Sequence, residues 1–339
     1  MLPASFPPKP WEKPLSAAFP DSAAFGCAYG LSAALSTVTA LPFPGAGGIE
    51  RRIDVFHAPD HLVPKLRGVP VVATICDALA VKRPDWINAG AGRYRSILVQ
   101  SAAKWARHVI AISATMVPDL VQHFGIPEKS ISVVHMGVGQ EWFEPAPETE
   151  KTAVLEKYGI AAGYFLFVGT LQPRKNVENI VAAYEGLPRE IRSVRQLVIA
   201  GQPGWGSAPL QERLRVMQQE RQCIWLQYVP ARELRALYQC AGAFVFPSLS
   251  EGFGMPVLEA FASEVPVITS NLSSLPEVAG QAAVLIDPYS VSELRDAMAR
   301  LAENAGLAAS LVEKGRVRAR ELSWELCAGK TLEVYRKIL

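Results

Sequence analysis

Short apolar runs rich in Val and Ile alternate with longer segments of helical periodicity from about residue 53 onward. The runs are continuously apolar, which is typical of strands buried on both faces of a parallel sheet. Ser113 is expected to cap a helix running towards Phe124, and Ser323 a last helix. This alternation predicts an α/β fold with right-handed crossovers. The expected strands are Ile53–His57, Val69–Ile75, His108–Ile112, Ser132–Val134, Tyr164–Val168, Gln196–Ala200, Ile224–Leu226, Ala243–Phe246, Val265–Ile268 and Ala283–Leu285.

A domain boundary is indicated at residues 141–152, which read EWFEPAPETEKT. This polar, proline-bearing stretch has the composition of a linker. We therefore expect two doubly wound parallel-sheet domains that face a cleft, one of residues 1–145 and one of residues 146–322. Ligands of such domains bind at the carboxyl ends of the strands.

Composition excludes several classes of protein. Half of the 339 residues are apolar, 19% are charged and the net charge is +2, so the chain is neither disordered nor suited to nucleic acid. The five cysteines are scattered, which fits reduced thiols better than disulfides or a zinc site. No GxGxxG or GxxxxGK[ST] motif supports dinucleotide redox or P-loop chemistry.

The stretch of residues 22–49, near the N-terminus, contains no charged side chain and is long enough to span a membrane. Small and hydroxyl side chains dominate it, and Pro42 and Pro44 interrupt it, so a membrane span is disfavoured. Six prolines within residues 3–20 also disfavour a signal peptide. We expect a loose arm leading into a weak helix, with no opening strand in residues 1–50.

The first candidate segment for chemistry follows the strand that ends at Val168. It reads Gly169-Thr-Leu-Gln-Pro-Arg174-Lys175-Asn. Gly169 would allow a close approach of backbone or ligand, and two adjacent cations suit a diphosphate. A solvated Arg-Lys pair in an ordinary loop is the equally weighted alternative.

The second candidate segment, Pro247–Glu259, follows the strand ending at Phe246 and opens a helix at Pro256. The amide groups near Met255, Val257 and Leu258 would be donors at a helix N-terminus, where anions bind. Glu259 has stabilisation by the helix dipole as a simpler explanation. Glu251, between a loop serine and Gly252, is best explained as a reader of hydroxyl groups.

These two segments resemble a known family. The sequence E-G-F-G-M-P-V-L-E, with Glu251 and Glu259 separated by seven residues, resembles the E-x7-E signature of family 4 retaining glycosyltransferases. F-V-G-T-L-Q-P-R-K-N resembles that family's donor-phosphate loop. The resemblance extends over residues 53–339, and it implies a GT-B fold whose last helix, residues 323–339, crosses back to the N-terminal domain.

The resemblance also implies roles for individual residues. Gly169, Arg174 and Lys175 would bind the donor diphosphate, and Glu259 would bind the nucleotide ribose. Glu251 would act on the donor sugar. Together with the backbone of Gly252, Phe253, Gly254 and Met255, it would hold that sugar in place. The family needs no metal, and the nucleotide-sugar is a co-substrate rather than a resident cofactor. Retention of anomeric configuration is implied as well.

On the acceptor side, this chain reads Thr74-Ile75-Cys76-Asp77 where many relatives have His-Asp. Cys76 cannot donate a hydrogen bond as imidazole does, so Asp77 is the candidate acceptor-side catalytic residue. Capping of the following loop is the alternative explanation for Asp77. His57 and His61 are not expected to form a metal pair, because Pro59 lies between them.

Residues 82–108 carry six cations against Asp85, with Trp86, Tyr94 and Trp105 interleaved. Such a stretch fits an anionic membrane surface, or equally an ordinary solvated helix face.

The expected function is transfer of a sugar, with GDP-mannose as the donor suggested by the Asp60–Pro64 region. The acceptor would be a glycan or lipid-linked sugar in surface polysaccharide or lipopolysaccharide synthesis at the cytoplasmic face of the membrane. A GT-B nucleotide-sugar epimerase and a non-catalytic sugar-nucleotide-binding protein remain as alternatives.

Overall fold

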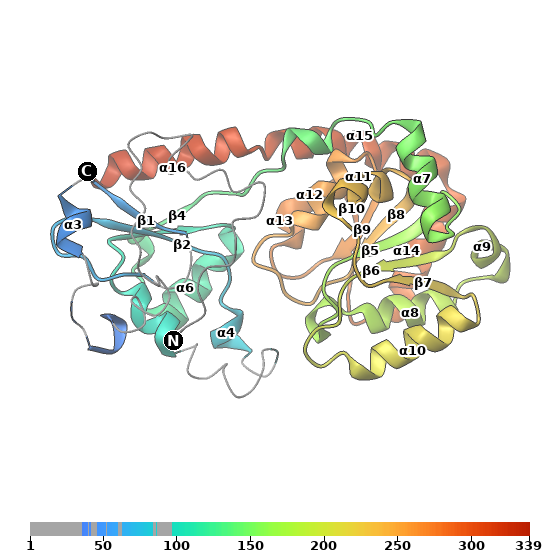
Figure 1. The fold of residues 1–339 in the computed structure, drawn as a ribbon, viewed down its shortest axis with the longest axis horizontal. Helices are drawn as coiled ribbons and strands as arrows, with labels where there is room; N and C mark the ends of the chain where they lie inside the picture. Colours follow the sequence, from blue (N-terminus) through green and yellow to red (C-terminus); the bar gives the residue numbers. More distant parts are fainter. Residues whose placement is uncertain are drawn as a thin grey trace.

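The chain folds into two lobes, each built around a parallel sheet (Figure 1). The computed structural model describes residues 36–39, 41, 46–51, 53–59, 63–83, 86 and 97–339. The arm expected within residues 1–50 and the Asp60–Pro64 region therefore lie largely outside the described residues. The last part of the arm contains a short helix, α3 (Ala46–Glu50).

The N-terminal lobe has a four-stranded parallel sheet in the order β1-β2-β3-β4, so its described strands follow the order of the chain. All four expected strands are present, with bounds shifted by up to three residues. The strands are β1 (Phe56–Ala58), β2 (Val71–Ile75), β3 (His108–Ala111) and β4 (Ile131–Val133). The helices beside them are α4 (Leu79–Lys82), the 3₁₀ turn η2 (Ala114–Met116), α6 (Val117–Phe124) and the turns η3 (Glu128–Ser130) and η4 (Gln140–Trp142).

The C-terminal lobe has a six-stranded parallel sheet in the order β10-β9-β8-β5-β6-β7. The strand order reverses between β5 and β8, which is the switch point where doubly wound sheets bind ligands. The expected strands are again all present. They are β5 (Tyr164–Val168), β6 (Leu197–Ala200), β7 (Cys223–Leu226), β8 (Ala241–Phe246), β9 (Val267–Ser270) and β10 (Ala283–Ile286).

Helices cover both faces of this second sheet, which explains why its strands are apolar without alternation. Phe165, Phe167, Phe244 and Phe246 are fully buried, and the rings of Phe167 and Phe246 stack at 6.0 Å. The helices are α7 (Glu148–Tyr158), α8 (Val177–Glu185), α9 (Arg189–Val194), α10 (Ala208–Gln219), α11 (Ala231–Gln239), α12 (Met255–Ala262), α13 (Leu275–Ala279), α14 (Val291–Glu303) and α15 (Ala305–Glu321), with the turn η5 (Pro173–Lys175).

The last helix, α16 (Trp324–Ile338), runs from the C-terminal lobe back along the N-terminal lobe (Figure 1). As predicted, Ser323 caps it, because its side chain accepts a hydrogen bond from the Leu326 amide at 3.2 Å. Val334 and Ile338 pack into a buried cluster of the N-terminal lobe. Tyr335 also contacts the His57 ring, at 2.6 Å between Oη and Nδ1.

Ser113 differs from its prediction. It precedes η2, but its hydroxyl makes no capping hydrogen bond to that turn. It donates instead to the Gly252 carbonyl in the other lobe, at 2.9 Å. The hydroxyl therefore serves contact between the lobes rather than the helix start.

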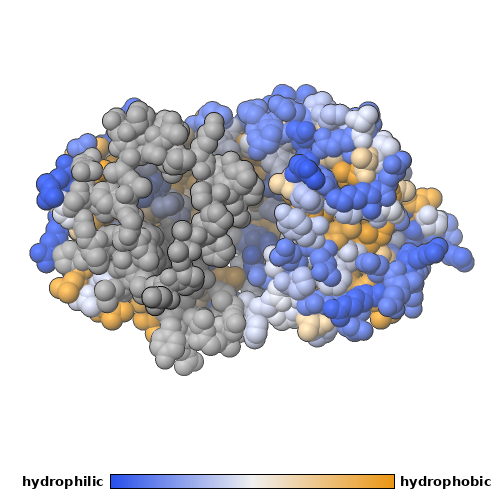
Figure 2. Space-filling view, viewed as in Figure 1, coloured by the Kyte–Doolittle hydropathy of each residue, from blue (hydrophilic) through white to orange (hydrophobic). Residues whose placement is uncertain are grey.

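The visible face of the C-terminal lobe is mostly hydrophilic, with apolar residues between the polar ones (Figure 2). No helix in the described part of the chain has the length and apolar character needed to cross a membrane.

Candidate active site

Two loops flank the switch point of the C-terminal sheet. The loop after β5 carries Arg174 and Lys175 in the turn η5, and the loop after β8 carries Glu251. Gly169 begins the first loop with φ of +153°, a conformation that favours glycine. A Cβ on Gly201 would lie 1.9 Å from the Gly169 carbonyl oxygen, so the neighbouring loop packs directly against this backbone. The close approach expected at Gly169 is thus made by the protein itself.

The carboxylate of Glu251 joins the two loops. Arg174 Nη1 lies 2.7 Å from Oε2, Lys175 Nζ lies 2.6 Å from Oε1, and Ser248 Oγ lies 2.6 Å from Oε1. Burial would raise the pKa of Glu251, but the charges of Lys175 and Arg174 outweigh it and hold the pKa below its usual range. The alternative of a solvated Arg-Lys pair is wrong, since Lys175 is only 8% exposed.

Two serines of the segment before α13 hold the backbone around Glu251. The Ser273 hydroxyl donates to the Glu251 carbonyl at 2.7 Å and accepts from the Glu251 amide at 3.1 Å. The Ser274 hydroxyl lies 2.5 Å from the Phe253 carbonyl. Sequence reasoning did not identify Ser248, Ser273 or Ser274, although a serine pair two residues before Pro276 is a signal for a helix start.

Glu259 lies in α12, and its environment differs from that of Glu251. Its nearest polar partner is the hydroxyl of Tyr238, 3.2 Å from Oε2, in the adjacent helix α11. Burial raises the pKa of Glu259 to about 7, since the neutral phenol offsets little of the desolvation. The carboxyl group is therefore poised to change charge near neutral pH.

The start of α12 corrects one part of the sequence prediction. The Val257 amide donates to the Gly254 carbonyl at 2.9 Å, so it is not the free anion donor that the sequence predicts. The side chains of Phe253, Val257 and Leu258 are buried in the core and support the loop from behind. Gly254, with φ of +133°, makes the turn into the helix.

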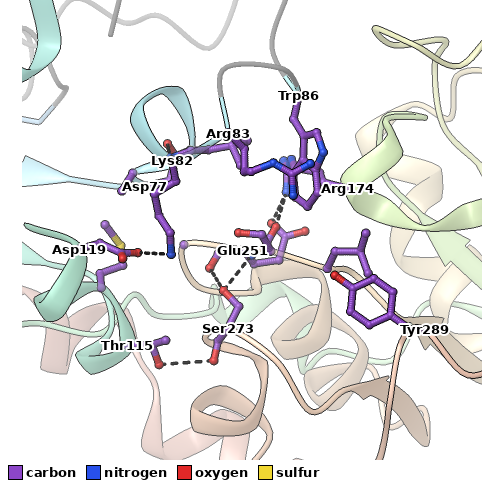
Figure 3. Close-up of a pocket in the computed structure, with 16 residues that line it drawn as sticks. Asp77, Lys82, Arg83, Trp86, Thr115, Asp119, Arg174, Glu251, Ser273 and Tyr289 are labelled. Carbon is purple, nitrogen blue, oxygen red and sulfur yellow. Dashed lines mark hydrogen bonds and ion pairs between the residues drawn. The ribbon is translucent and has the colours of Figure 1, made fainter. Parts of the chain in front are cut away.

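A pocket of about 450 Å³ lies between the lobes, next to these loops (Figure 3). Four residues of the predicted site line it, namely Asp77, Arg174, Glu251 and Gly252. Glu251 lies near the centre of the view, with Asp77 on one side and Tyr289 on the other. The other residues that line the pocket are Ala78, Leu79, Lys82, Arg83, Trp86, Thr115, Met116, Asp119, Leu249, Ser250 and Ser273.

The two lobes touch directly at the floor of this pocket. A Cβ built on Gly252 would lie 1.8 Å from the carbonyl oxygen of Cys76. Asp77, the next residue, accepts a hydrogen bond from the Leu79 amide at 3.1 Å through Oδ1. Asp77 therefore makes the local loop contact expected of a capping residue and also lines the pocket, so both explanations for it have support.

The basic segment 82–108 does not present one common surface in its described residues. Lys82 pairs with Asp119 at 2.9 Å, and Arg83 stacks over Trp86, with all four residues lining the pocket. Further along the segment, Lys104 lies over the Trp105 ring. Arg93, Tyr94 and Arg95 lie outside the described residues.

Potential metal ligands and cysteines are scattered through the described residues. No group of three or more His, Cys, Asp or Glu side chains there is arranged to hold a metal ion. Cys223, Cys240 and Cys327 form no disulfide.

Two parallel-sheet lobes with this pocket at the switch point define a GT-B glycosyltransferase fold. The chain belongs to Glycosyltransferase Family 4. The model of that family matches residues 44–142, and the model of the family Glycosyl transferases group 1 matches residues 155–318. O-antigen chain mannosyltransferase B of Escherichia coli is 30% identical over 83% of this chain and 74% of that protein. The serotype-specific mannosyltransferase WbdA of Escherichia coli is 27% identical over 74% of this chain but 31% of its own length.

Solved structures agree on the fold. HepE of Anabaena, in complex with UDP and glucose, superposes with a TM-score of 0.70 at 16% identity, covering 87% of this chain and 82% of HepE. WaaG, a glycosyltransferase involved in lipopolysaccharide biosynthesis, gives a TM-score of 0.67 at 16% identity over 88% of this chain and 81% of WaaG. The prediction of a GT-B fold and of family 4 is confirmed.

Proposed function

We propose that this glycosyltransferase transfers a mannosyl residue from a GDP-mannose-like donor, with retention of configuration, to a glycan or lipid-linked acceptor of O-antigen or lipopolysaccharide. The observation that carries the proposal is the shared pocket. It brings Arg174 and Glu251 of the C-terminal lobe opposite Asp77 of the N-terminal lobe.

Charge at the switch point supports a diphosphate leaving group. Arg174 lines the pocket, and Lys175 stands behind it on the same carboxylate. The two cations would meet the negative charge that grows on the diphosphate as its bond to the sugar breaks. Gly169, which starts this loop, leaves room for the backbone to approach the phosphates.

Glu251 is suited to the donor sugar. Its Oε1 accepts from Lys175 and Ser248, whereas its Oε2, within the described part of the chain, accepts only from Arg174. A carboxylate oxygen has two acceptor sites, so Oε2 retains one for a sugar hydroxyl. Glu251 would also attract the positive charge that develops on the sugar ring. Gly252, Phe253, Gly254 and Met255 would supply the backbone beside the sugar.

Glu259 would bind the hydroxyl groups of the nucleotide ribose. The buried side chains of Val257 and Leu258 would support this part of α12 from the core. An ionised carboxylate accepts hydrogen bonds from both ribose hydroxyls, whereas a protonated one accepts fewer. Asp77, on the opposite wall, is assigned to the acceptor hydroxyl.

The relatives support the choice of substrates. O-antigen chain mannosyltransferases of Escherichia coli and Salmonella typhimurium are 30% and 27% identical to this chain, respectively. We further propose that the reaction needs no metal and no resident cofactor. We also propose that the enzyme works at the cytoplasmic face of the membrane, with the basic segment of residues 82–108 meeting anionic lipid.

A transfer assay tests the proposal. The protein is incubated with GDP-mannose, UDP-glucose or UDP-galactose and a mannose-terminated acceptor, with and without EDTA, and released nucleoside diphosphate is measured. We expect release only with GDP-mannose, only with acceptor present, and unchanged by EDTA. The anomeric signal of the product in an NMR spectrum reports retention or inversion.

Other outcomes have distinct meanings. Release without an acceptor-derived product indicates hydrolysis, and donor binding without release indicates a binding protein. Use of a UDP-sugar instead refutes the choice of donor but not of reaction. Flotation with vesicles containing anionic lipid, compared with neutral vesicles, tests the membrane contact.

A further inference from the structure

The side chain of Glu277 crosses from one lobe to the other. Glu277 belongs to α13 of the C-terminal lobe, and its carboxylate lies among donors at the ends of β3 and β4 in the N-terminal lobe. The Ala114 amide donates to Oε1 at 2.8 Å, and the Thr115 amide donates to Oε2 at 3.1 Å. The Thr115 hydroxyl donates to Oε2 at 2.9 Å, and His135 Nε2 lies 2.6 Å from Oε1.

Among the described residues, no other carboxylate accepts as many hydrogen bonds from the opposite lobe as Glu277. Burial would raise its pKa, but the bonds from His135 and from the Ala114 and Thr115 amides outweigh this and lower the pKa to about 2. The side chain is 19% exposed and that of His135 is 27% exposed, so water has limited access to the contact. The carboxylate is therefore ionised at every pH at which the enzyme would work.

The backbone of α13 continues this contact into the donor loop, which we define as residues 247–254. Ser273 and Ser274, just before α13, hold the Glu251 and Phe253 carbonyls. On the other side, Arg318 of α15 donates to the carbonyls of Glu277 and Val278 at 2.7 and 3.0 Å. The helix thus links the N-terminal lobe, the donor loop and the body of the C-terminal lobe.

We propose that Glu277 is a positioning residue for the transfer reaction: by fastening α13 to the ends of β3 and β4, it sets the donor loop against the acceptor wall of the pocket. This rests on the proposed function for the assignment of donor and acceptor sides. Glu277 itself does not line the pocket, so it acts through Thr115 on one wall and through Ser273 and Glu251 on the other rather than on the substrates.

The contact requires a carboxylate rather than another acceptor. Four donors converge on its two oxygens, two from backbone amides that cannot rotate away. Glutamine offers one acceptor oxygen and turns its own NH₂ group towards a donor, which leaves donors unpaired. Aspartate keeps the charge but is shorter by one methylene, so it recovers part of the contact.

Three variants separate positioning from folding. Glu277→Gln removes the charge, Glu277→Asp retains it, and Thr115→Val removes one donor from the opposite lobe. Glu313→Gln is the matched control, because Glu313 pairs with Arg316 on the exposed face of α15, away from the contact between the lobes. Each variant is compared for melting temperature, donor affinity, kcat, acceptor KM and amide hydrogen exchange at Ala114 and Thr115.

We expect Glu277→Gln to bind donor within about twofold of the wild type while kcat divided by acceptor KM falls about 10–100-fold. Glu277→Asp should recover part of that loss, and Thr115→Val should show a smaller loss of the same kind. Exchange at the Ala114 and Thr115 amides should accelerate in Glu277→Gln and not in Glu313→Gln.

Unchanged transfer in Glu277→Gln overturns the proposal, and so does a parallel loss of donor affinity, acceptor use and melting temperature, which indicates a structural role only. An equal loss in Glu277→Asp and Glu277→Gln also counts against it. If the wild-type protein transfers no sugar, the proposed function fails. The exchange measurement then still decides whether Glu277 fastens the lobes, since it needs no substrate.

Discussion

Glu251 and Glu259 are separated by seven residues, yet the pKa values of their carboxyl groups shift in opposite directions. Glu251 faces two cations and stays ionised, whereas Glu259 faces the neutral phenol of Tyr238 and has its pKa raised to about 7. The resemblance to family 4 implies a place in the donor site for both residues. The difference in charge between them depends on Arg174, Lys175 and Tyr238, which approach from other segments of the chain.

The raised pKa of Glu259 predicts a pH-dependent donor affinity. The free protein holds a proton on Glu259 below about pH 7. In the proposed complex the ionised carboxylate would accept hydrogen bonds from the ribose hydroxyls, so donor binding would favour the ionised form. Donor binding should therefore release a proton, and the affinity should fall up to about tenfold for each pH unit below 7. Titration calorimetry in two buffers of different ionisation enthalpy measures both quantities.

Glu259→Gln is the control for this pH effect and should give a weaker but nearly pH-independent affinity. The raised pKa of Glu259 also affects the free energy of unfolding of the donor-free protein, which should fall as the pH rises, whereas donor affinity should increase. A carboxyl whose folded pKa is raised stabilises the fold most below its usual pKa, and this contribution is lost as the pH rises through about 7. A donor affinity that is flat from pH 6 to 8 in the wild type would contradict the assignment.

Removing the charge of Glu251 should harm both stability and turnover. Glu251→Gln leaves the ammonium of Lys175, 8% exposed, without its anionic partner, which typically costs about 3–5 kcal/mol. Turnover should fall about 10²–10³-fold, as for other single electrostatic groups in active sites. Melting temperature and single-turnover kinetics measure the two effects.

A double variant distinguishes the two contributions. Adding Lys175→Met to Glu251→Gln removes the unpaired charge, so melting temperature should recover while turnover stays low. If Glu251→Gln melts like the wild type, the ion pairs of Glu251 do not stabilise the fold. If it turns over at the wild-type rate, the role of Glu251 at the donor sugar is wrong.

Among the elements, the ten strands of the described residues could be predicted because most of them are short apolar runs rich in Val and Ile, as strands buried in a parallel sheet are. Helix starts were harder to predict. Ser323 and Ser113 both precede helical turns, but only Ser323 caps one. The hydroxyl of Ser113 has a better acceptor in the Gly252 carbonyl, 139 positions away in the sequence. Local patterns carry no information about such a partner, and the same holds for Glu277 and His135.

Loss of the Ser323 cap should weaken attachment of α16 to the N-terminal lobe. Ser323→Ala removes the acceptor for the Leu326 amide and should cost about 1 kcal/mol. Hydrogen exchange should then accelerate from Leu326 to Tyr335 and in β2, against which Val334 packs.

Ser290 provides the matched control for this variant. It caps α14 by accepting from the Glu293 amide at 3.2 Å, and α14 lies wholly within the C-terminal lobe. Ser290→Ala should lower stability by a similar amount without altering exchange in the N-terminal lobe. Equal exchange patterns in the two variants would show that α16 does not stabilise the N-terminal lobe.

At the scale of the whole molecule, the candidate site exists only where the two lobes meet. The sequence identified the diphosphate loop, the Glu251 loop and Asp77 as separate segments, and the parallel-sheet topology explains why the first two converge at the switch point. It could not predict how closely the lobes approach. That distance is set by contacts such as Gly252 against Cys76, which depend on the tertiary fold.

Gly252→Ala should therefore hold the lobes apart. The added Cβ would lie 1.8 Å from the Cys76 carbonyl, and backbone on both sides cannot move aside by a rotamer change. We expect donor affinity near that of the wild type, transfer at least about tenfold slower, and a larger radius of gyration in small-angle scattering.

Gly329→Ala is the control, since a Cβ there meets nothing within 4 Å and lies on the exposed side of α16. It should leave scattering and transfer unchanged and stabilise the helix slightly. Scattering of Gly252→Ala identical to that of the wild type, with full activity, would mean that a shift of the loop absorbs the added methyl group.

The chain passes between the lobes twice at one place, where the Val138 amide donates to the Leu322 carbonyl at 3.0 Å. A Cβ on Gly137 would lie 2.1 Å from the backbone of Ser323 and Trp324, so the two passes are packed backbone to backbone. Because the two passes are hydrogen-bonded to each other at one place, they form a single covalent pivot between the lobes. A protease cut in either pass would leave the other in place, so the nicked molecule should stay in one piece with a looser pivot.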